Sequence, residues 1–143
     1  MKIAGVSLSQ IGIYAAIVIV VAGVGYFVWA RKHKPSKLDL SSFKARWQEA
    51  QKLCGKEDTW PLAIINADKL VEDALRKRKY KGKTMGEKLV SAQHDIQDND
   101  AIWFAHKLRN KLVHEDLKKL KKKDVLEALI GFRETLKDLG ALE

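Results

Sequence analysis

The sequence predicts an all-α protein in two parts: a single N-terminal transmembrane helix, followed by an up-and-down bundle of four or five helices. Residues 8–30 contain no charged side chain. From residue 41 onward, apolar residues recur at intervals of three and four, as they do on one face of a helix. No run in this later part shows the sustained alternation of apolar and polar residues that is typical of strands.

The uncharged segment is LSQIGIYAAIVIVVAGVGYFVWA, residues 8–30, which follows a short tail of residues 1–7. A helix needs about 20 apolar residues to cross the hydrocarbon core of a bilayer. The competing interpretation is a secretory signal peptide, whose apolar region is usually about 7 to 15 residues long and ends in a small-residue cleavage site. The length of this segment, and its ending in FVWA before RKHK, favour an uncleaved anchor.

The charges on either side of this segment predict its orientation. Lys2 is the only charged side chain before it. A basic linker, residues 31–40, follows and holds four cations, Arg31, Lys32, Lys34 and Lys37. The positive-inside rule then puts the amino terminus outside and the C-terminal domain in the cytoplasm. We therefore expect a single-pass protein of the cell membrane whose basic residues attract anionic lipids of the inner leaflet.

Capping and stop signals divide the predicted bundle, residues 41–143, into helices. Ser41 or Ser42 is expected to cap a first helix that runs through Leu53. Its apolar face holds Phe43, Trp47 and Ala50. A second helix begins at Thr59, tolerates a proline in its first turn and ends near Tyr80.

Three further helices complete the prediction. Thr84 followed by Glu87 forms a capping-box pattern that opens the third helix. The fourth runs over about residues 100–115, and the fifth begins near Asp124. The core residues expected from the third and fifth helices are Met85, Leu89, Val90, Ile96, Val125, Leu126, Leu129, Ile130, Phe132, Leu136 and Leu139.

The fourth predicted helix carries the residues that suggest a site. At about 100° per residue, one face collects six of them: Trp103, His106, Arg109, Asn110, Val113 and His114. The opposite face is apolar and predicts core contacts without them: Ala101, Phe104, Ala105, Leu108 and Leu112. A face that mixes aromatic and hydrogen-bonding side chains is typical of a cleft or of an interface between copies.

The segment RNKLVH, residues 109–114, resembles the R-N-x-x-x-H motif of HEPN domains, small all-helical bundles that include metal-independent ribonucleases. The stretch ADKLVEDALRKRKYKGKTMGEKL, residues 67–89, also resembles the helix and Lys-Gly-Lys-Thr turn that precede this motif in one uncharacterised, HEPN-like branch. This resemblance implies that Arg109 and His114 are catalytic and that Asn110 supports them. It also implies that two copies of the motif meet across the cleft of a homodimer.

The chemistry of these residues fits RNA cleavage. Histidine exchanges protons near neutral pH, and a guanidinium stabilises charge that develops on a phosphoryl group. Such cleavage uses the ribose 2′-hydroxyl as an internal nucleophile, so it acts on RNA and needs no metal or other cofactor.

Other functions remain open for the same residues. HEPN-like domains also serve as non-catalytic modules that bind RNA, dimerise or hold a protein partner, which this sequence does not identify. In a purely structural role, Arg109 forms an ion pair with Asp68, Glu72 or Asp73. His114 then only stabilises the C-terminal end of its helix.

The net charge of +9 is concentrated in two basic clusters. The first cluster holds Arg76, Lys77, Arg78 and Lys79, and the second holds Lys118, Lys119, Lys121, Lys122 and Lys123. RNA phosphates and anionic lipids bind such clusters by the same electrostatic attraction, so charge alone leaves both partners open.

Several kinds of site lack support in the sequence. The single cysteine, Cys54, excludes an intrachain disulfide, and the four histidines do not have the spacing of a zinc site. Neither a phosphate-binding loop, nor a dinucleotide-binding glycine pattern, nor a nucleophile elbow occurs. The sequence therefore predicts neither a metal nor a cofactor.

Overall fold

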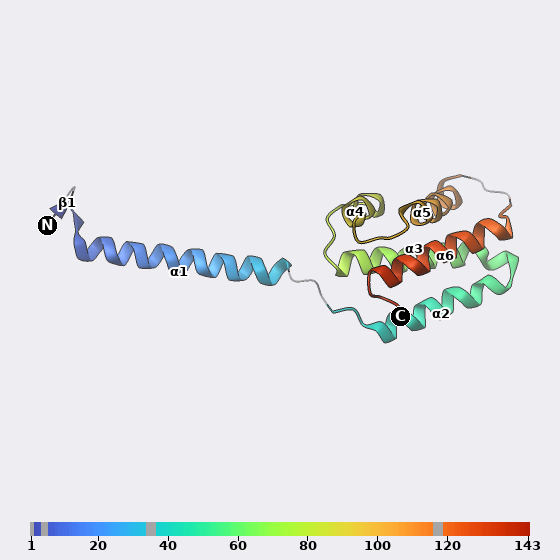
Figure 1. The fold of residues 1–143 in the computed structure, drawn as a ribbon, viewed down its shortest axis with the longest axis horizontal. Helices are drawn as coiled ribbons and strands as arrows, with labels where there is room; N and C mark the ends of the chain where they lie inside the picture. The colour runs from blue at the N-terminus through green and yellow to red at the C-terminus, as the bar shows by residue number, and fades with distance from the viewer. Residues whose placement is uncertain (1, 4–5, 34–36, 116–118) are drawn as a thin grey trace. The chain divides into compact units, whose positions relative to one another are not determined.

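The computed structural model describes residues 2–3, 6–33, 37–115 and 119–143, and its contacts divide the chain into two compact units (Figure 1). Unit 1 comprises residues 1–34, and unit 2, which we call the helical domain, comprises residues 35–143. Residues 34–36 of the predicted basic linker lie outside the described residues.

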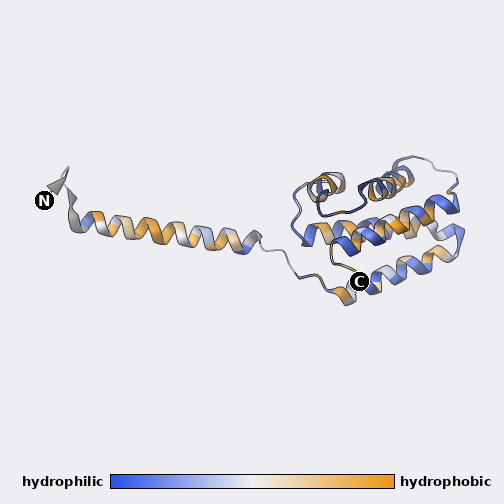
Figure 2. Cartoon of the chain, viewed as in Figure 1, coloured by the Kyte–Doolittle hydropathy of each residue, from blue (hydrophilic) through white to orange (hydrophobic). Residues whose placement is uncertain are grey.

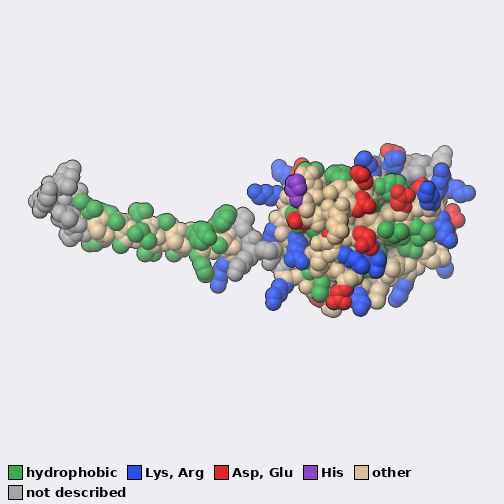
Figure 3. Space-filling model, viewed as in Figure 1, with side chains coloured by type: hydrophobic (Ala, Val, Ile, Leu, Met, Phe, Trp, Pro, Cys, Tyr) green, Lys and Arg blue, Asp and Glu red, His purple; other side chains and the backbone are tan. Residues whose placement is uncertain are grey.

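Unit 1 consists mainly of one long apolar helix. Two short antiparallel strands, β1 (Lys2–Ile3) and β2 (Val6–Ser7), precede α1 (Leu8–His33). The segment Gln10–Arg31 is long and apolar enough to cross a bilayer, and none of it is buried within the protein. Hydrophobic residues predominate along α1 in Figure 2, and Figure 3 shows hydrophobic side chains on its surface. The structure thus confirms the predicted apolar N-terminal helix.

The described residues of the helical domain form five α-helices: α2 (Leu40–Lys52), α3 (Trp60–Lys77), α4 (Met85–Ala92), α5 (Asn99–His114) and α6 (Lys122–Asp138). Two 3-10 turns, η1 (Leu53–Gly55) and η2 (Glu57–Thr59), connect α2 to α3. Helix α3 is central and contacts the other four. In Figure 1, α4 and α5 are seen nearly end-on along one side of α3 and α6, and α2 lies on the other side. The predicted all-α fold class, an apolar helix followed by a helical bundle, is confirmed.

The core of the domain forms where the apolar faces of the helices meet (Figure 2). Phe43, Trp47 and Ala50 of α2 are buried, as their spacing predicts. The largest fully buried apolar side chains come from all five helices: Phe43, Ile64, Leu70, Val71, Leu75, Leu89, Ile102, Val125, Phe132 and Leu136. Ile102 is missing from the predicted apolar face of α5, although it is completely buried.

Some predicted core positions are exposed. Leu126 and Ile130 of α6 are 47% and 61% exposed. Residues 125, 129 and 132 define the inward face of α6, and the two exposed positions lie about 100° around the helix from it. Val90 of α4 is 55% exposed, because it lies about 100° around the helix from Leu89, which is on the buried face. Ile96 is buried, but it follows the helix rather than belonging to it.

Two helix boundaries also differ from the prediction. Asp39, not Ser41 or Ser42, caps α2, since its Oδ1 accepts hydrogen bonds from the Ser42 amide at 3.2 Å and the Ser41 hydroxyl at 2.6 Å. These bonds, the Ser41 bond above all, lower the pKa of Asp39. Helix α3 ends at Lys77 rather than near Tyr80, because Lys79 adopts a left-handed conformation with φ of 67°.

The connection from α3 to α4 is fixed at both of its ends. Arg78 donates from Nε to the Leu139 carbonyl at 2.8 Å, after the end of α6. The Tyr80 hydroxyl donates to Asp95 Oδ2 at 2.6 Å, and burial together with this bond raises the pKa of Tyr80 to about 12. The predicted capping box then starts α4, with Thr84 accepting from the Glu87 amide. These contacts position the N-terminal end of α4 beside α5.

Helices α5 and α6 approach most closely at Gly131. A Cβ atom at this position would lie 2.7 Å from the Ala101 carbonyl oxygen. We expect Gly131→Ala to destabilise the protein by about 1 to 3 kcal/mol, because backbone rather than a flexible side chain must move. Urea unfolding of the full chain in detergent measures this change. Gly55→Ala is the matched control, since nothing lies within 4 Å of its added Cβ. Equal stability of the two variants would contradict the close approach.

Candidate functional site

A groove of about 540 Å³ lies where α3, the N-terminal end of α4 and α5 meet. It is lined by Asp68, Glu72, Thr84, Met85, Gly86, Trp103, His106, Lys107, Arg109, Asn110 and His114. Five of the six residues predicted from the α5 face therefore lie together in one groove. The sixth, Val113, is 48% exposed and does not line it.

Four side chains at the base of the groove form a closed polar network, which we call the Asp68 network. Asp68 Oδ1 lies 2.8 Å from His106 Nδ1, and His106 Nε2 lies 3.2 Å from Asn110 Nδ2. Arg109 Nη1 donates to Asn110 Oδ1 at 3.1 Å. Arg109 Nε lies 3.3 Å from Asp68 Oδ2, as an ion pair that is not aligned as a hydrogen bond. The network joins one residue of α3 to three of α5.

The network gives His106 a structural role in addition to its predicted place in the groove. The sequence placed this residue on a face that the core does not need, but His106 is only 7% exposed. Asp68 on α3 supplies a buried hydrogen-bond acceptor, so the imidazole packs between helices instead of facing solvent. His106 is therefore part of the support of the groove.

The sequence predicts Asp68 only as one of three possible ion-pair partners of Arg109, although its position also indicates a buried carboxylate. Asp68 lies at the centre of the apolar stripe of α3, between Ile64 one turn before and Val71 and Leu75 after. A carboxylate on a buried helix face needs a partner. Asp68 is 2% exposed and meets that need with His106 and Arg109.

Arg109 and His114 differ in how they are held. The Arg109 side chain is 25% exposed, with Nε and Nη1 directed at the Asp68 network. Among the described residues, its Nη2 has no hydrogen-bond partner, which leaves this nitrogen for a ligand. His114 is the last residue of α5 and is exposed at the rim of the groove. The groove therefore combines a held guanidinium with an imidazole open to solvent.

Trp103 forms one wall of the groove. Its ring lies edge-on to His106, with ring centroids 6.1 Å apart. Its far end lies over Gly86 of α4, where an added Cβ would be 3.5 Å from the ring. Glu72 stands nearby and accepts from the buried Lys88 at 3.4 Å. The groove thus contains aromatic, cationic and anionic side chains.

The residues of the two predicted basic clusters differ in their contacts. In Figure 3, lysine and arginine side chains are spread over the visible face of the helical domain, with carboxylates between them. Arg76 and Arg46 both pair with Asp73. Burial would raise the pKa of Asp73, but these two arginines outweigh it and hold the pKa below its ordinary value.

The other cluster residues differ in exposure. Arg78 binds the carbonyl of Leu139, and the Lys77 ammonium lies 5.3 Å from the centre of the Phe43 ring. Lys118 lies outside the described residues. The remaining predicted cluster residues are exposed: Lys79, Lys119, Lys121, Lys122 and Lys123. Of the two clusters, the second is the one whose described lysines are all open to solvent.

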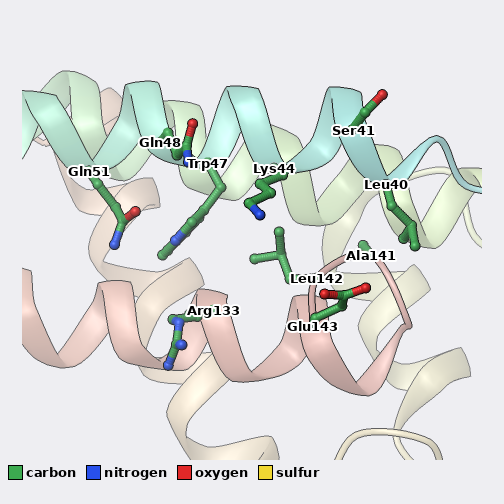
Figure 4. Close-up of a pocket in the computed structure, with 10 residues that line it drawn as sticks. All are labelled: Leu40, Ser41, Lys44, Trp47, Gln48, Gln51, Arg133, Ala141, Leu142 and Glu143. Atoms are coloured by element: carbon green, nitrogen blue, oxygen red, sulfur yellow. The ribbon is translucent and has the colours of Figure 1, made fainter.

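A second hollow, of about 420 Å³, lies between α2, α6 and the C-terminal residues (Figure 4). Its polar side chains include Lys44, Arg133 and Glu143, while Trp47 and Leu142 contribute apolar surface. It contains no histidine and none of the residues predicted to act on a substrate. We therefore place the candidate site in the groove that His114 borders.

Comparison with known proteins identifies no relative. No protein-family model matches the sequence, and no curated protein or solved structure is significantly similar to it.

The described residues contain no group of three or more His, Cys, Asp or Glu side chains that could hold a metal ion. Burial raises the pKa of the Cys54 thiol, which donates to the Ala50 carbonyl. This favours the protonated thiol over the nucleophilic thiolate.

Proposed function

We propose that this protein is a membrane-anchored, metal-independent endoribonuclease of the HEPN-like type, with its helical domain in the cytoplasm. The observation that carries the proposal is that Arg109, Asn110 and His114 line a single groove. The resemblance of residues 109–114 to the R-N-x-x-x-H motif supports the same assignment. The apolar helix α1 and the basic residues after it support the anchor and its orientation.

In this proposal His114 moves protons and Arg109 binds the phosphoryl group. The 2′-oxygen of the ribose attacks the adjacent phosphorus while the bond to the 5′-oxygen breaks. A base removes the 2′-hydroxyl proton, and an acid returns a proton to the leaving 5′-oxygen. The products are a 2′,3′-cyclic phosphate and a 5′-hydroxyl, so no water, metal or redox partner enters this step.

The homodimer implied by the resemblance gives this chemistry two histidines. His114 of one copy serves as the base and His114 of the second copy as the acid, with an Arg109 beside each. The exposure of His114 at the rim of the groove is compatible with such a meeting. Anchoring by α1 favours dimerisation, because it confines the copies to the membrane and raises their effective concentration.

The test uses the full chain in lipid nanodiscs with single-stranded RNA and EDTA. We expect cleavage that leaves 2′,3′-cyclic phosphate ends, and no cleavage when every 2′-hydroxyl of the same RNA is methylated. Cleavage of the methylated RNA would refute the internal nucleophile, and dependence on added metal would refute the metal-independent mechanism. Absence of cleavage over a series of RNA sequences would remove the enzymatic proposal.

The second candidate is a non-catalytic module that holds RNA at the membrane. It is favoured by the exposed lysines at 119 and 121–123, which follow the motif helix in the chain. Phosphate binding to such lysines weakens steeply with salt. RNA binding that falls when Lys119, Lys121, Lys122 and Lys123 are neutralised, without any cleavage by the unmodified chain, would establish this candidate instead.

A further inference from the structure

The Asp68 network has only one consistent set of hydrogen-bond directions. The Arg109 guanidinium can only donate, so the Asn110 oxygen faces it and the Asn110 amide nitrogen faces His106. His106 Nε2 must therefore accept, and its Nδ1 carries the proton that it donates to Asp68. In this arrangement His106 is neutral, and the Asp68 charge is balanced by Arg109.

This assignment gives His106 and His114 different roles in the groove. Both ring nitrogens of His106 are occupied, and its side chain is only 9% exposed. A ring in that state cannot exchange a proton with a substrate unless the network opens. His114 remains available at the rim. The chemistry that we propose for the groove therefore needs His106 as a support rather than as an acid or base.

The network also restrains the guanidinium of Arg109 from two directions. Asp68 attracts its Nε side, and Asn110, itself held by His106, accepts from Nη1. Two separated partners prevent the planar group from turning about its bonds. Its Nη2, which has no hydrogen-bond partner among the residues that the structure describes, is then held in one orientation. Pre-oriented donors of this kind stabilise developing charge without having to reorganise during the reaction.

We propose that Asp68 is a positioning residue, which acts directly and through His106 and Asn110 to hold the Arg109 guanidinium in the orientation that binds a phosphoryl group. The effect of Asp68 on catalysis rests on the proposed ribonuclease function. The restraint of Arg109 is a property of the folded chain, so it can be measured without any cleavage.

The experiment uses the full chain in nanodiscs, with isotopically labelled arginine and histidine, and the near-isosteric variant Asp68→Asn. In the unmodified chain we expect separate NMR signals for the two Nη atoms of Arg109 and a protonated Nδ1 on His106. In Asp68→Asn the two Nη signals are expected to merge, because the guanidinium rotates freely. Asp73→Asn is the matched control, since Asp73 lies on the same helix and binds arginines outside the groove.

Cleavage and binding supply the second readout. Asp68→Asn is expected to lower the maximal cleavage rate about 100-fold. RNA affinity is expected to stay within about threefold of the unmodified chain, because orientation matters most in the transition state. Asp73→Asn should change neither quantity.

The outcomes distinguish the positioning role from the ribonuclease proposal. Without cleavage by the unmodified chain, the ribonuclease proposal fails, while the Nη signals still decide whether Asp68 restrains Arg109. Merged Nη signals in the unmodified chain, or separate signals in Asp68→Asn, would overturn the positioning role. Unchanged cleavage by Asp68→Asn would overturn it as well. If Asp68→Asn does not fold, Asn110→Ala tests the same restraint, since it removes the acceptor of Nη1 from a partly buried position.

Discussion

His114→Ala is expected to lower the rate of RNA cleavage by at least about 100-fold, the usual contribution of a positioned acid or base. His114 is the exposed imidazole of the groove, and His106, which has both ring nitrogens occupied, cannot take its place. The fold should survive this change, because His114 is the exposed last residue of α5. RNA affinity should therefore change by less than about threefold.

The measurement compares single-turnover cleavage and RNA binding by full chains in nanodiscs. His94→Ala is the matched control, because His94 is exposed after α4 and does not line the groove. Equal cleavage by His114→Ala and the unmodified chain would exclude His114 from the chemistry. A mixture of His114→Ala and unmodified copies tests the dimer. A pair with only one His114 lacks either the base or the acid, so it should cleave RNA only slowly.

Arg109→Ala is expected to lower the free energy of unfolding by about 3 to 5 kcal/mol, because it leaves the Asp68 charge buried without a cation. Asp68 is 2% exposed, and the neutral His106 does not neutralise it. A loss of this size is a large fraction of the stability of an ordinary domain. Lost cleavage in Arg109→Ala would then reflect unfolding as much as chemistry, so Arg109→Lys is the better variant for activity.

Urea unfolding monitored by helical circular dichroism measures this effect. Arg133→Ala is the control, because Arg133 pairs with Glu134 on the surface and its removal should change stability by no more than about 0.5 kcal/mol. The double variant Asp68→Asn with Arg109→Ala should recover part of the lost stability, since no buried charge remains. A double variant that is less stable than Arg109→Ala alone would refute the ion-pair explanation.

The sequence predicted the helices well because their signals are local. Periodic apolar residues, the Thr84–Glu87 capping box and the uncharged span of residues 8–30 each act over a few turns of chain. The errors at helix ends are also local. Asp39 precedes both serines and starts the helix earlier, because its carboxylate is a charged acceptor for the Ser42 amide.

The candidate site was predictable only in part, because part of its support comes from another helix. The face of α5 identified Trp103, Arg109, Asn110 and His114, which the groove does bring together. The burial of His106 depends on the position of α3, and a helical projection of α5 alone cannot show that position. Asp68 was considered as an ion-pair partner of Arg109, but its bond to His106 and its place at the base of the groove follow from the packing of α3 against α5.

The Asp68 network also affects how this motif should be compared between related chains. Asp68, His106 and Arg109 satisfy each other inside the fold, so stability alone would select for their retention in a descendant that has lost all activity. His114 is exposed and takes no part in these contacts among the described residues, so mutation could replace it once the chemistry was no longer needed. In a set of homologues, the presence of a histidine aligned with His114 should therefore distinguish active from inactive members. The presence of an arginine aligned with Arg109 should not distinguish them.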